Sequence, residues 1–192
     1  VLDLFDVNSP VIKERAFSGD GATVGEIGRA YIEGMQDAGM AATGKHFPGH
    51  GRVLADSHTE LPTDTRSLDE IRENDLIPFV KCIQSLDAIM PAHIVFPEVD
   101  EHCAGFSKVW IESLLRAELG FDGVVFSDDL TMDAAHSAGT ITERANLALA
   151  AGCDMVLICN HPEQAAAVVD YLHEKQQPGN NRIDCMLAKN AS

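Results

Sequence analysis

Basic residues are scarce in this chain of 192 residues. It has 14 lysines and arginines against 30 aspartates and glutamates, which gives a formal charge of -16 at neutral pH. A strongly acidic surface repels nucleic acid and anionic membranes, so we expect neither as a partner. The acidic excess itself indicates a solvated surface and no specific function.

Long hydrophobic runs and paired cysteines are also lacking. No stretch approaches the ~20 apolar residues of a membrane helix, and no signal peptide is visible. Five cysteines are scattered without a C-x-x-C pair, which argues against a disulfide framework or zinc knuckle and favours reduced thiols in a cytoplasm; they are Cys82, Cys103, Cys153, Cys159 and Cys185. The chain opens inside an apolar segment, so we expect its true N-terminus to lie upstream.

Short apolar segments alternate with segments of helical period. Strands are predicted at residues 1–7, 40–46, 88–93, 123–128 and 155–160. Helices are predicted at residues 24–36, 67–85, 108–119, 142–151 and 163–173; the second is broken before Pro78, where Asp75 can cap its second part. Such alternation predicts an α/β fold with a parallel sheet and helical crossovers, in a single domain over residues 1–192.

Polar residues stand where each predicted strand ends. They are Asp6, Lys45 and His46, His93, Asp128 and Asp129, and Asn160. A ring of reactive groups at the carboxyl ends of successive strands is typical of a (β/α)8 barrel. A doubly wound sheet, the competing architecture, gathers its ligand at one switch point instead. The pattern favours the barrel, which would be incomplete because a full barrel needs ~250 residues.

The segment Lys45-His46-Phe47-Pro48-Gly49-His50-Gly51, followed by Asp56-Ser57-His58, carries the strongest chemical signal. A single loop histidine usually faces solvent, but here three histidines, a lysine and an aspartate converge. They could bind a metal through His46, His50, Asp56 and His58. Alternatively, Asp56 orients His58, which carries a proton to and from a substrate oxygen. The residues alone do not separate these two interpretations.

The second informative segment is Gly123-Val124-Val125-Phe126-Ser127-Asp128-Asp129-Leu130. Alternation along a strand puts Asp128 and Asp129 on opposite faces. One of them can point into a site while the other caps the following turn, and alternation does not say which. A carboxylate that faces a proton donor across a sugar is the minimum equipment of a retaining glycosidase.

Together, KHFPGHGRVLADSH and DGVVFSDDLTM closely resemble the bacterial β-N-acetylglucosaminidases of glycoside hydrolase family 3. The likeness covers nearly the whole chain, including VIKERAF, DAIMPAH and AGCDMVLICN. It implies a (β/α)8 barrel, of which this chain would supply strands four to eight and lack the upstream strands. The implied substrate is N-acetylglucosamine linked β-1,4 to 1,6-anhydro-N-acetylmuramic acid, with or without a peptide. The resemblance also implies action in the cytoplasm, no cofactor or metal, and a monomer at full length.

By position, the resemblance implies that Asp128 is the nucleophile, and that His58 with Asp56 forms the acid/base dyad. It also implies that Lys45, His46 and Arg15 bind the sugar. Family members commonly read I-G-D-R where this chain has Ile12-Lys13-Glu14-Arg15. The remaining polar residues at the strand ends are expected to be structural or to support the site: His50, His93, Asp129 and Asn160.

Three other functions remain open: a metal-dependent hydrolase or deacetylase that uses the histidine cluster, a sugar phosphorylase, and a sugar-binding module without turnover. A histidine acid/base also tolerates an incoming phosphate, so the residues do not exclude a phosphorylase. The presence of both Asp128 and His58 argues against a binding module.

Overall fold

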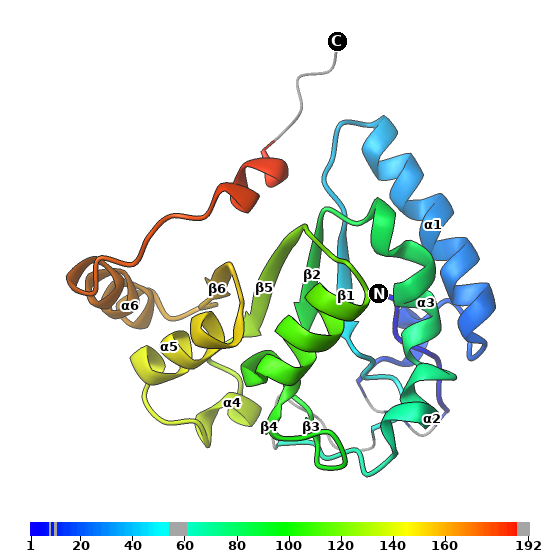
Figure 1. Cartoon of the computed structure of the whole chain (residues 1–192), viewed down its shortest axis with the longest axis horizontal. Coiled ribbons are helices and arrows are strands. Elements are labelled where there is room, and N and C mark those ends of the chain that lie inside the picture. The colour runs from blue at the N-terminus through cyan, green and yellow to red at the C-terminus, as the bar shows by residue number, and fades with distance from the viewer. Residues whose placement is uncertain (8, 10, 54–60, 188–192) are drawn as a thin grey trace.

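The structure is a computed structural model and describes residues 1–7, 9, 11–53 and 61–187. Its centre is a parallel sheet of four strands in the spatial order β1-β2-β5-β6 (Figure 1). The strands are β1 (Thr43–Phe47), β2 (Ala88–Pro91), β5 (Val124–Asp129) and β6 (Met155–Leu157). Successive strands of this sheet are neighbours and the order never reverses, as in an arc of a barrel and unlike a doubly wound sheet. The predicted α/β fold is confirmed.

Helical crossovers join the strands of this sheet. The α-helices are α1 (Gly21–Asp37), α2 (Leu68–Arg72), α3 (Leu76–Cys82), α4 (Asp133–His136), α5 (Ile141–Ala151) and α6 (Pro162–Glu174). A π-helix, η4 (Val109–Glu118), precedes β5, and short 3-10 helices occur at η1 (Lys13–Arg15), η2 (Ile83–Ser85), η3 (Ala104–Phe106) and η5 (Asn181–Met186). In the part of the chain that the structure describes, no helix is long and apolar enough to cross a membrane.

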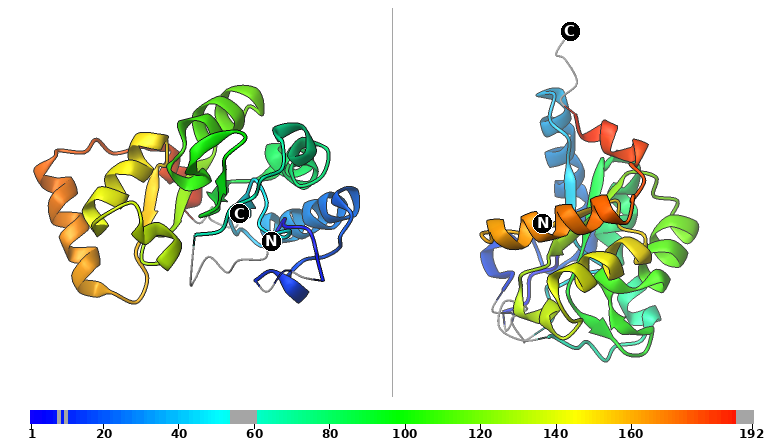
Figure 2. Two further views of the ribbon diagram at one scale, coloured as in Figure 1. Left: turned by 90° about the horizontal axis from the view of Figure 1, so that it is seen from below. Right: turned by 90° about the vertical axis from the view of Figure 1, so that its left-hand side faces the viewer.

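The helices pack in two groups at opposite ends of the sheet. α1 contacts α3 near β1, and α5 contacts α6 near β6 (Figures 1 and 2). The first helix shows why the sequence folds this way: the Asp20 side chain accepts the Thr23 N–H and caps it, and Val24, Gly28 and Ile32 form a buried face at four-residue spacing. This buried face places α1 beside the sheet and leaves its opposite side in solvent.

The helix predicted over residues 67–85 is two helices, α2 and α3, with a turn at residues 73–75 between them. The break predicted before Pro78 is therefore confirmed, and it lies at residues 73–75. Pro78 is the third residue of α3, where its missing N–H has no intrahelical partner to lose. Asp75 stands at the N-cap but makes no side-chain capping bond, because its carboxylate binds Arg66 instead.

The strand predicted at residues 1–7 is wrong, although the segment is extended and buries Leu2 and Leu4. The Leu2 N–H donates to the Lys45 carbonyl of β1, but the Phe5 N–H donates to Ser18, so no ladder continues. The carboxylate of Asp3 accepts N–H groups on the β1 side that a neighbouring strand would otherwise bind. Leu2 and Leu4 are buried as in a strand, but the Asp3 side chain replaces the main-chain pairing.

An antiparallel hairpin that the sequence analysis missed follows β2. Its strands are β3 (Val95–Phe96) and β4 (Asp100–Cys103). Phe96 of this hairpin packs on Trp110 of η4 with ring centroids 5.0 Å apart, and Trp110 also meets Phe47 of β1 at 6.0 Å. These three aromatic residues are fully buried and connect the carboxyl end of β1 to the hairpin and η4. Aromatic burial of this kind is a major part of core stability.

Candidate active site

The carboxyl ends of β1, β2 and β5 bring together histidine and aspartate side chains. His46 belongs to β1, His93 follows β2, and Asp128 lies near the end of β5. Burial lowers the pKa of His93, and the charge of Asp128 opposes this effect. Burial likewise lowers the pKa of His50, and the charges of Asp3 and Asp128 oppose this effect. Asp128 is therefore close enough to influence both buried imidazoles, and the strand ends form one polar site.

Asp129 holds the turn that follows β5. Its carboxylate accepts the N–H and the hydroxyl of Thr131 at 2.8–2.9 Å, and the Cys159 N–H beyond β6 at 3.1 Å. Burial alone would raise the pKa of Asp129, but these hydrogen bonds outweigh it and lower the pKa. Asp129 is therefore the aspartate that holds the turn, a role that strand alternation could not assign to either Asp128 or Asp129.

Asp128 is the aspartate without that structural duty. It is half-buried, and its Oδ1 accepts the N–H of Asp129 at 2.8 Å. The Asp129 carbonyl lies 3.2 Å from His93 Nε2, which fixes the backbone beside Asp128 from the other side. The Asp128 side chain is thus held at the strand end while remaining partly accessible to a ligand.

The glycines of the KHFPGHG segment permit close packing below the site. A Cβ on Gly51 would lie 1.8 Å from the Leu4 carbonyl oxygen, and a Cβ on Gly49 would lie 2.7 Å from Asp75 Cβ. Gly49 also has a φ of +143°, which other residues rarely adopt. The segment therefore lies directly against residues 1–7 on one side and against α3 on the other.

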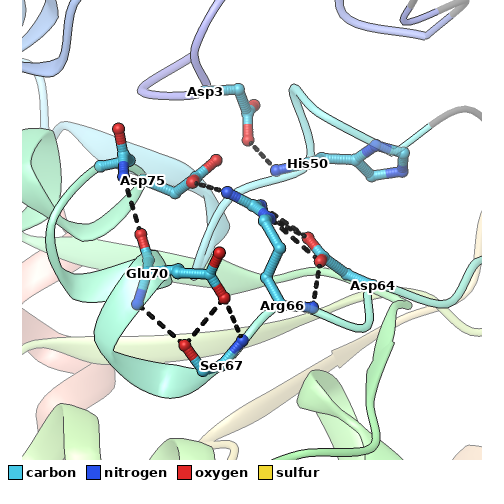
Figure 3. Close-up of polar contacts among 8 residues, drawn as sticks. Asp3, His50, Asp64, Arg66, Ser67, Glu70 and Asp75 are labelled. Carbon is cyan, nitrogen blue, oxygen red and sulfur yellow. Dashed lines mark hydrogen bonds and ion pairs between the residues drawn. The ribbon is translucent and has the colours of Figure 1, made fainter.

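A buried ion-pair cluster lies beside this segment (Figure 3). Arg66 donates to Asp64 at 2.6 Å and to Asp75 at 2.5 Å, and the two carboxylates are almost completely buried. Burial raises the pKa of Asp75, and the pairing with Arg66 offsets this only in part. Arg66 therefore supplies the positive charge that stabilises the two buried carboxylates next to Gly49.

Replacement of Arg66 by methionine is expected to destabilise the protein by about 2–4 kcal/mol, because it leaves two buried carboxylates without their cation. Denaturant unfolding measures this loss. The matched control is Arg29→Met, which removes a solvent-exposed i,i+4 pair with Glu33 and should cost less than ~1 kcal/mol. Equal losses in the two variants would show that the cluster contributes no more than a surface pair.

Arg15 and Lys45, both predicted to bind sugar, line one cavity of about 430 Å³ next to β1. Arg15 is exposed in η1, and apolar side chains including Phe17 and Tyr31 line the same cavity. His46, His93 and Asp128 do not line this cavity. The structure groups Arg15 with Lys45, and their contact with a sugar stays a prediction.

Asp56 and His58, the predicted acid/base dyad, lie outside the residues that the structure describes. The metal-binding alternative also used them, together with His46 and His50. The rings of His46 and His50 are 5.9 Å apart, and the Nδ1 atom of His46 is 2.8 Å from Asp3. Among residues 1–7, 9, 11–53 and 61–187, no three histidine, cysteine or acidic side chains are arranged to hold a metal ion.

Four residues were expected to be structural or to support the site, and one of them, Asp129, holds the turn after β5. His50 and His93 are indeed buried, at 1% and 0% exposure. Asn160 differs, because it is exposed in a left-handed conformation with a φ of +60°. Asp3 was missed, although a carboxylate between Leu2 and Leu4 in an apolar segment was the available signal.

The two buried histidines predict a pH dependence of stability. Their pKa values are lowered by burial, so the folded state keeps them neutral while the unfolded state takes up protons below about pH 6.5. Stability is therefore expected to fall as the pH drops below that value, by up to about 1.4 kcal/mol per pH unit for each histidine. Denaturant unfolding between pH 7.5 and 5.5 measures this slope. His93→Gln should reduce it, whereas the exposed His102→Gln should leave it unchanged.

The fold and the site define an arc of an α/β barrel that gathers imidazole and carboxylate groups at the carboxyl ends of its strands. The chain belongs to glycoside hydrolase family 3: residues 1–187 match the model described as the glycosyl hydrolase family 3 N-terminal domain. A curated β-hexosaminidase from Pseudomonas aeruginosa is 50% identical over 189 residues, which are 98% of this chain and 57% of that protein. The chain thus spans about half the length of the curated relatives it matches.

Solved structures show the same similarity. NagZ from Neisseria gonorrhoeae, in complex with N-trifluoroacetyl-D-glucosamine, is 44% identical with a TM-score of 0.85; the match covers 96% of this chain and 53% of that one. NagZ was also solved in complex with a zinc ion. A family 3 β-N-acetylglucosaminidase from Paenibacillus is 38% identical with a TM-score of 0.87, over 97% of this chain and 37% of that one.

Proposed function

We propose that the whole protein is a retaining exo-β-N-acetylglucosaminidase. The observation that carries this proposal is the half-buried Asp128, held at the end of β5 near His50 and His93, two buried histidines of lowered pKa that follow β1 and β2. The proposal is also supported by the relatives, which are named β-hexosaminidases and a β-N-acetylglucosaminidase. The specific substrate that we propose is terminal, non-reducing β-1,4-linked N-acetylglucosamine on 1,6-anhydro-N-acetylmuramic acid from peptidoglycan turnover. The proposed enzyme acts in the cytoplasm as a monomer.

The reaction proceeds in two displacements. In the first, the Asp128 carboxylate attacks the anomeric carbon and forms a glycosyl ester, while His58 donates a proton to the leaving oxygen. In the second, His58 removes a proton from water, which attacks the same carbon and releases the sugar with its original β configuration. Asp56 orients the imidazole and stabilises its charged form. A neutral base also avoids placing a second anion beside the ester as water attacks.

The sugar-binding groups belong to the β1 side of the site. Lys45 and His46 bind hydroxyl groups of the N-acetylglucosamine ring, and Arg15 contacts the same sugar from η1. The placement of Arg15 and Lys45 in the lining of one 430 Å³ cavity supports this assignment for those two residues.

The test uses the full-length protein with 4-nitrophenyl N-acetyl-β-D-glucosaminide and with the natural disaccharide. We expect release of N-acetylglucosamine from both, with the β anomer as the first product in a proton NMR time course. The matching α-glycoside should not react. Hydrolysis with inversion, or no turnover of either β-linked substrate, would refute the proposed function.

Two added conditions separate the rival reactions. We expect no metal requirement, because the carboxylate nucleophile and the imidazole proton carrier complete the chemistry. The zinc complex of NagZ makes this worth testing directly. Activity lost on chelation and restored by zinc would support the metal-dependent hydrolase. A sugar 1-phosphate formed in phosphate buffer would support the phosphorylase.

A further inference from the structure

We propose that Asp3 is a positioning residue that fixes the ring of His46, so that only Nε2 of His46 is presented to the sugar. This inference rests on the proposed function, in which His46 binds a sugar hydroxyl. It concerns a residue of the extended segment before η1, which the sequence analysis assigned no role.

The contacts of Asp3 all go to the carboxyl end of β1. Its Oδ2 lies 2.8 Å from His46 Nδ1, and both carboxylate oxygens accept the His46 N–H at 3.1 Å. Its Oδ1 also accepts the His50 N–H at 2.7 Å (Figure 3). One carboxylate therefore holds the ring of His46 and the backbone on both sides of the Phe47-Pro48-Gly49 turn.

The protonation state of this pair follows from its surroundings. The Asp3 side chain is completely buried, and burial alone would raise its pKa. The charge of His46 and the hydrogen bonds from His46 and His50 outweigh burial and lower the pKa of Asp3. Asp3 is therefore an ionised carboxylate, which can only accept hydrogen bonds. The proton between the two side chains must consequently reside on His46 Nδ1.

A fixed Nδ1–H leaves Nε2 as the other functional atom of the ring. When the ring is neutral, Nε2 accepts a hydrogen bond from a sugar hydroxyl group, and when the ring is protonated beside the Asp3 carboxylate, Nε2–H donates one. Without Asp3 the ring could rotate or change tautomer, and Nε2 would then present a proton in place of a lone pair. Loss of a carboxylate that orients a metal-binding histidine commonly lowers activity by about 10–10²-fold. We expect an effect of the same size for the loss of Asp3.

The experiment combines histidine NMR with a double-mutant cycle in the full-length protein. Nitrogen-15 spectra of histidine-labelled protein, assigned with His46→Gln, should show the proton on Nδ1 in the wild type. Asp3→Asn should populate the other tautomer and lower kcat/KM by about 10–10²-fold. In the His46→Gln background, Asp3→Asn should cost less than about 3-fold, because the two residues act as a unit.

Asp154→Asn is the matched control, because Asp154 is equally buried but pairs with Arg116 and the Val125 N–H at the opposite end of the sheet. It should lower stability without changing the His46 tautomer. Additive losses in the cycle, or a wild-type His46 that carries its proton on Nε2 alone, would overturn the proposal. The wild-type spectrum decides this even if Asp3→Asn fails to fold. An inactive wild type with the expected tautomer would instead refute the proposed function alone.

Discussion

Replacement of Asp128 by alanine in the full-length protein is expected to lower kcat/KM by about 10⁴–10⁶-fold, the range found when a covalent nucleophile or its activating partner is removed. The reason is that the proposed mechanism assigns formation of the glycosyl ester to Asp128 alone. Added azide should restore part of the turnover by occupying the vacated space, and the product should be the α-glycosyl azide. An assay with the 4-nitrophenyl glycoside, followed by NMR of the product, measures both effects.

Asp129→Asn is the matched control for this variant. The Asp129 carboxylate binds Thr131 and Cys159 in the turn after β5. The substitution should therefore lower the free energy of unfolding and leave kcat/KM much less affected than Asp128→Ala does. A variant at Asp129 that is inactive yet stable, with Asp128→Ala still active, would exchange the roles of the two aspartates.

Replacement of His58 by alanine is expected to reduce turnover of the natural disaccharide by about 10²–10⁴-fold, the usual contribution of a general acid or base. The first displacement should suffer much less with a 4-nitrophenyl leaving group, which departs without a proton. Pre-steady-state release of 4-nitrophenol isolates that step. Asp56→Asn should show the same pattern more weakly, because Asp56 acts through the imidazole.

The contradicting result is an equal loss on both substrates at the first step. It would mean that His58 positions the sugar or supports the loop, with proton transfer performed by another group. Addition of azide offers a second check, since an anion that needs no general base should accelerate the second displacement in His58→Ala and give the β-glycosyl azide.

Much of the fold could be predicted because local patterns agree with the tertiary structure. The helix predicted at residues 24–36 lies within α1, and the strand predicted at 123–128 differs from β5 by one residue at each end. Polar residues at strand ends indicated the site for a physical reason, because parallel strands end at one edge of the sheet. The proposed roles of Asp128 and His58 rest on the family resemblance, and alternation alone could not separate Asp128 from Asp129.

The errors have equally specific causes. Residues 1–7 are mostly apolar, which is typical of a buried strand, but the Asp3 side chain takes the place of main-chain pairing. The hairpin of β3 and β4 was missed because its strands are only two and four residues long, too short for a periodic signal. The sequence predicted that the Asp75 side chain caps α3, but the tertiary structure pairs its carboxylate with Arg66. The local pattern of the sequence does not predict polar contacts between residues that are distant along the chain.

The most direct test of the central claim is to trap the glycosyl-enzyme. A 5-fluoro analogue of N-acetylglucosaminyl fluoride should inactivate the full-length protein with the addition of one sugar per molecule. Peptide mapping by mass spectrometry should then place the label on Asp128, within the peptide that contains Phe126-Ser127-Asp128-Asp129. A label on Asp129, or complete turnover without any labelled carboxylate, would contradict the assignment of Asp128 as the nucleophile.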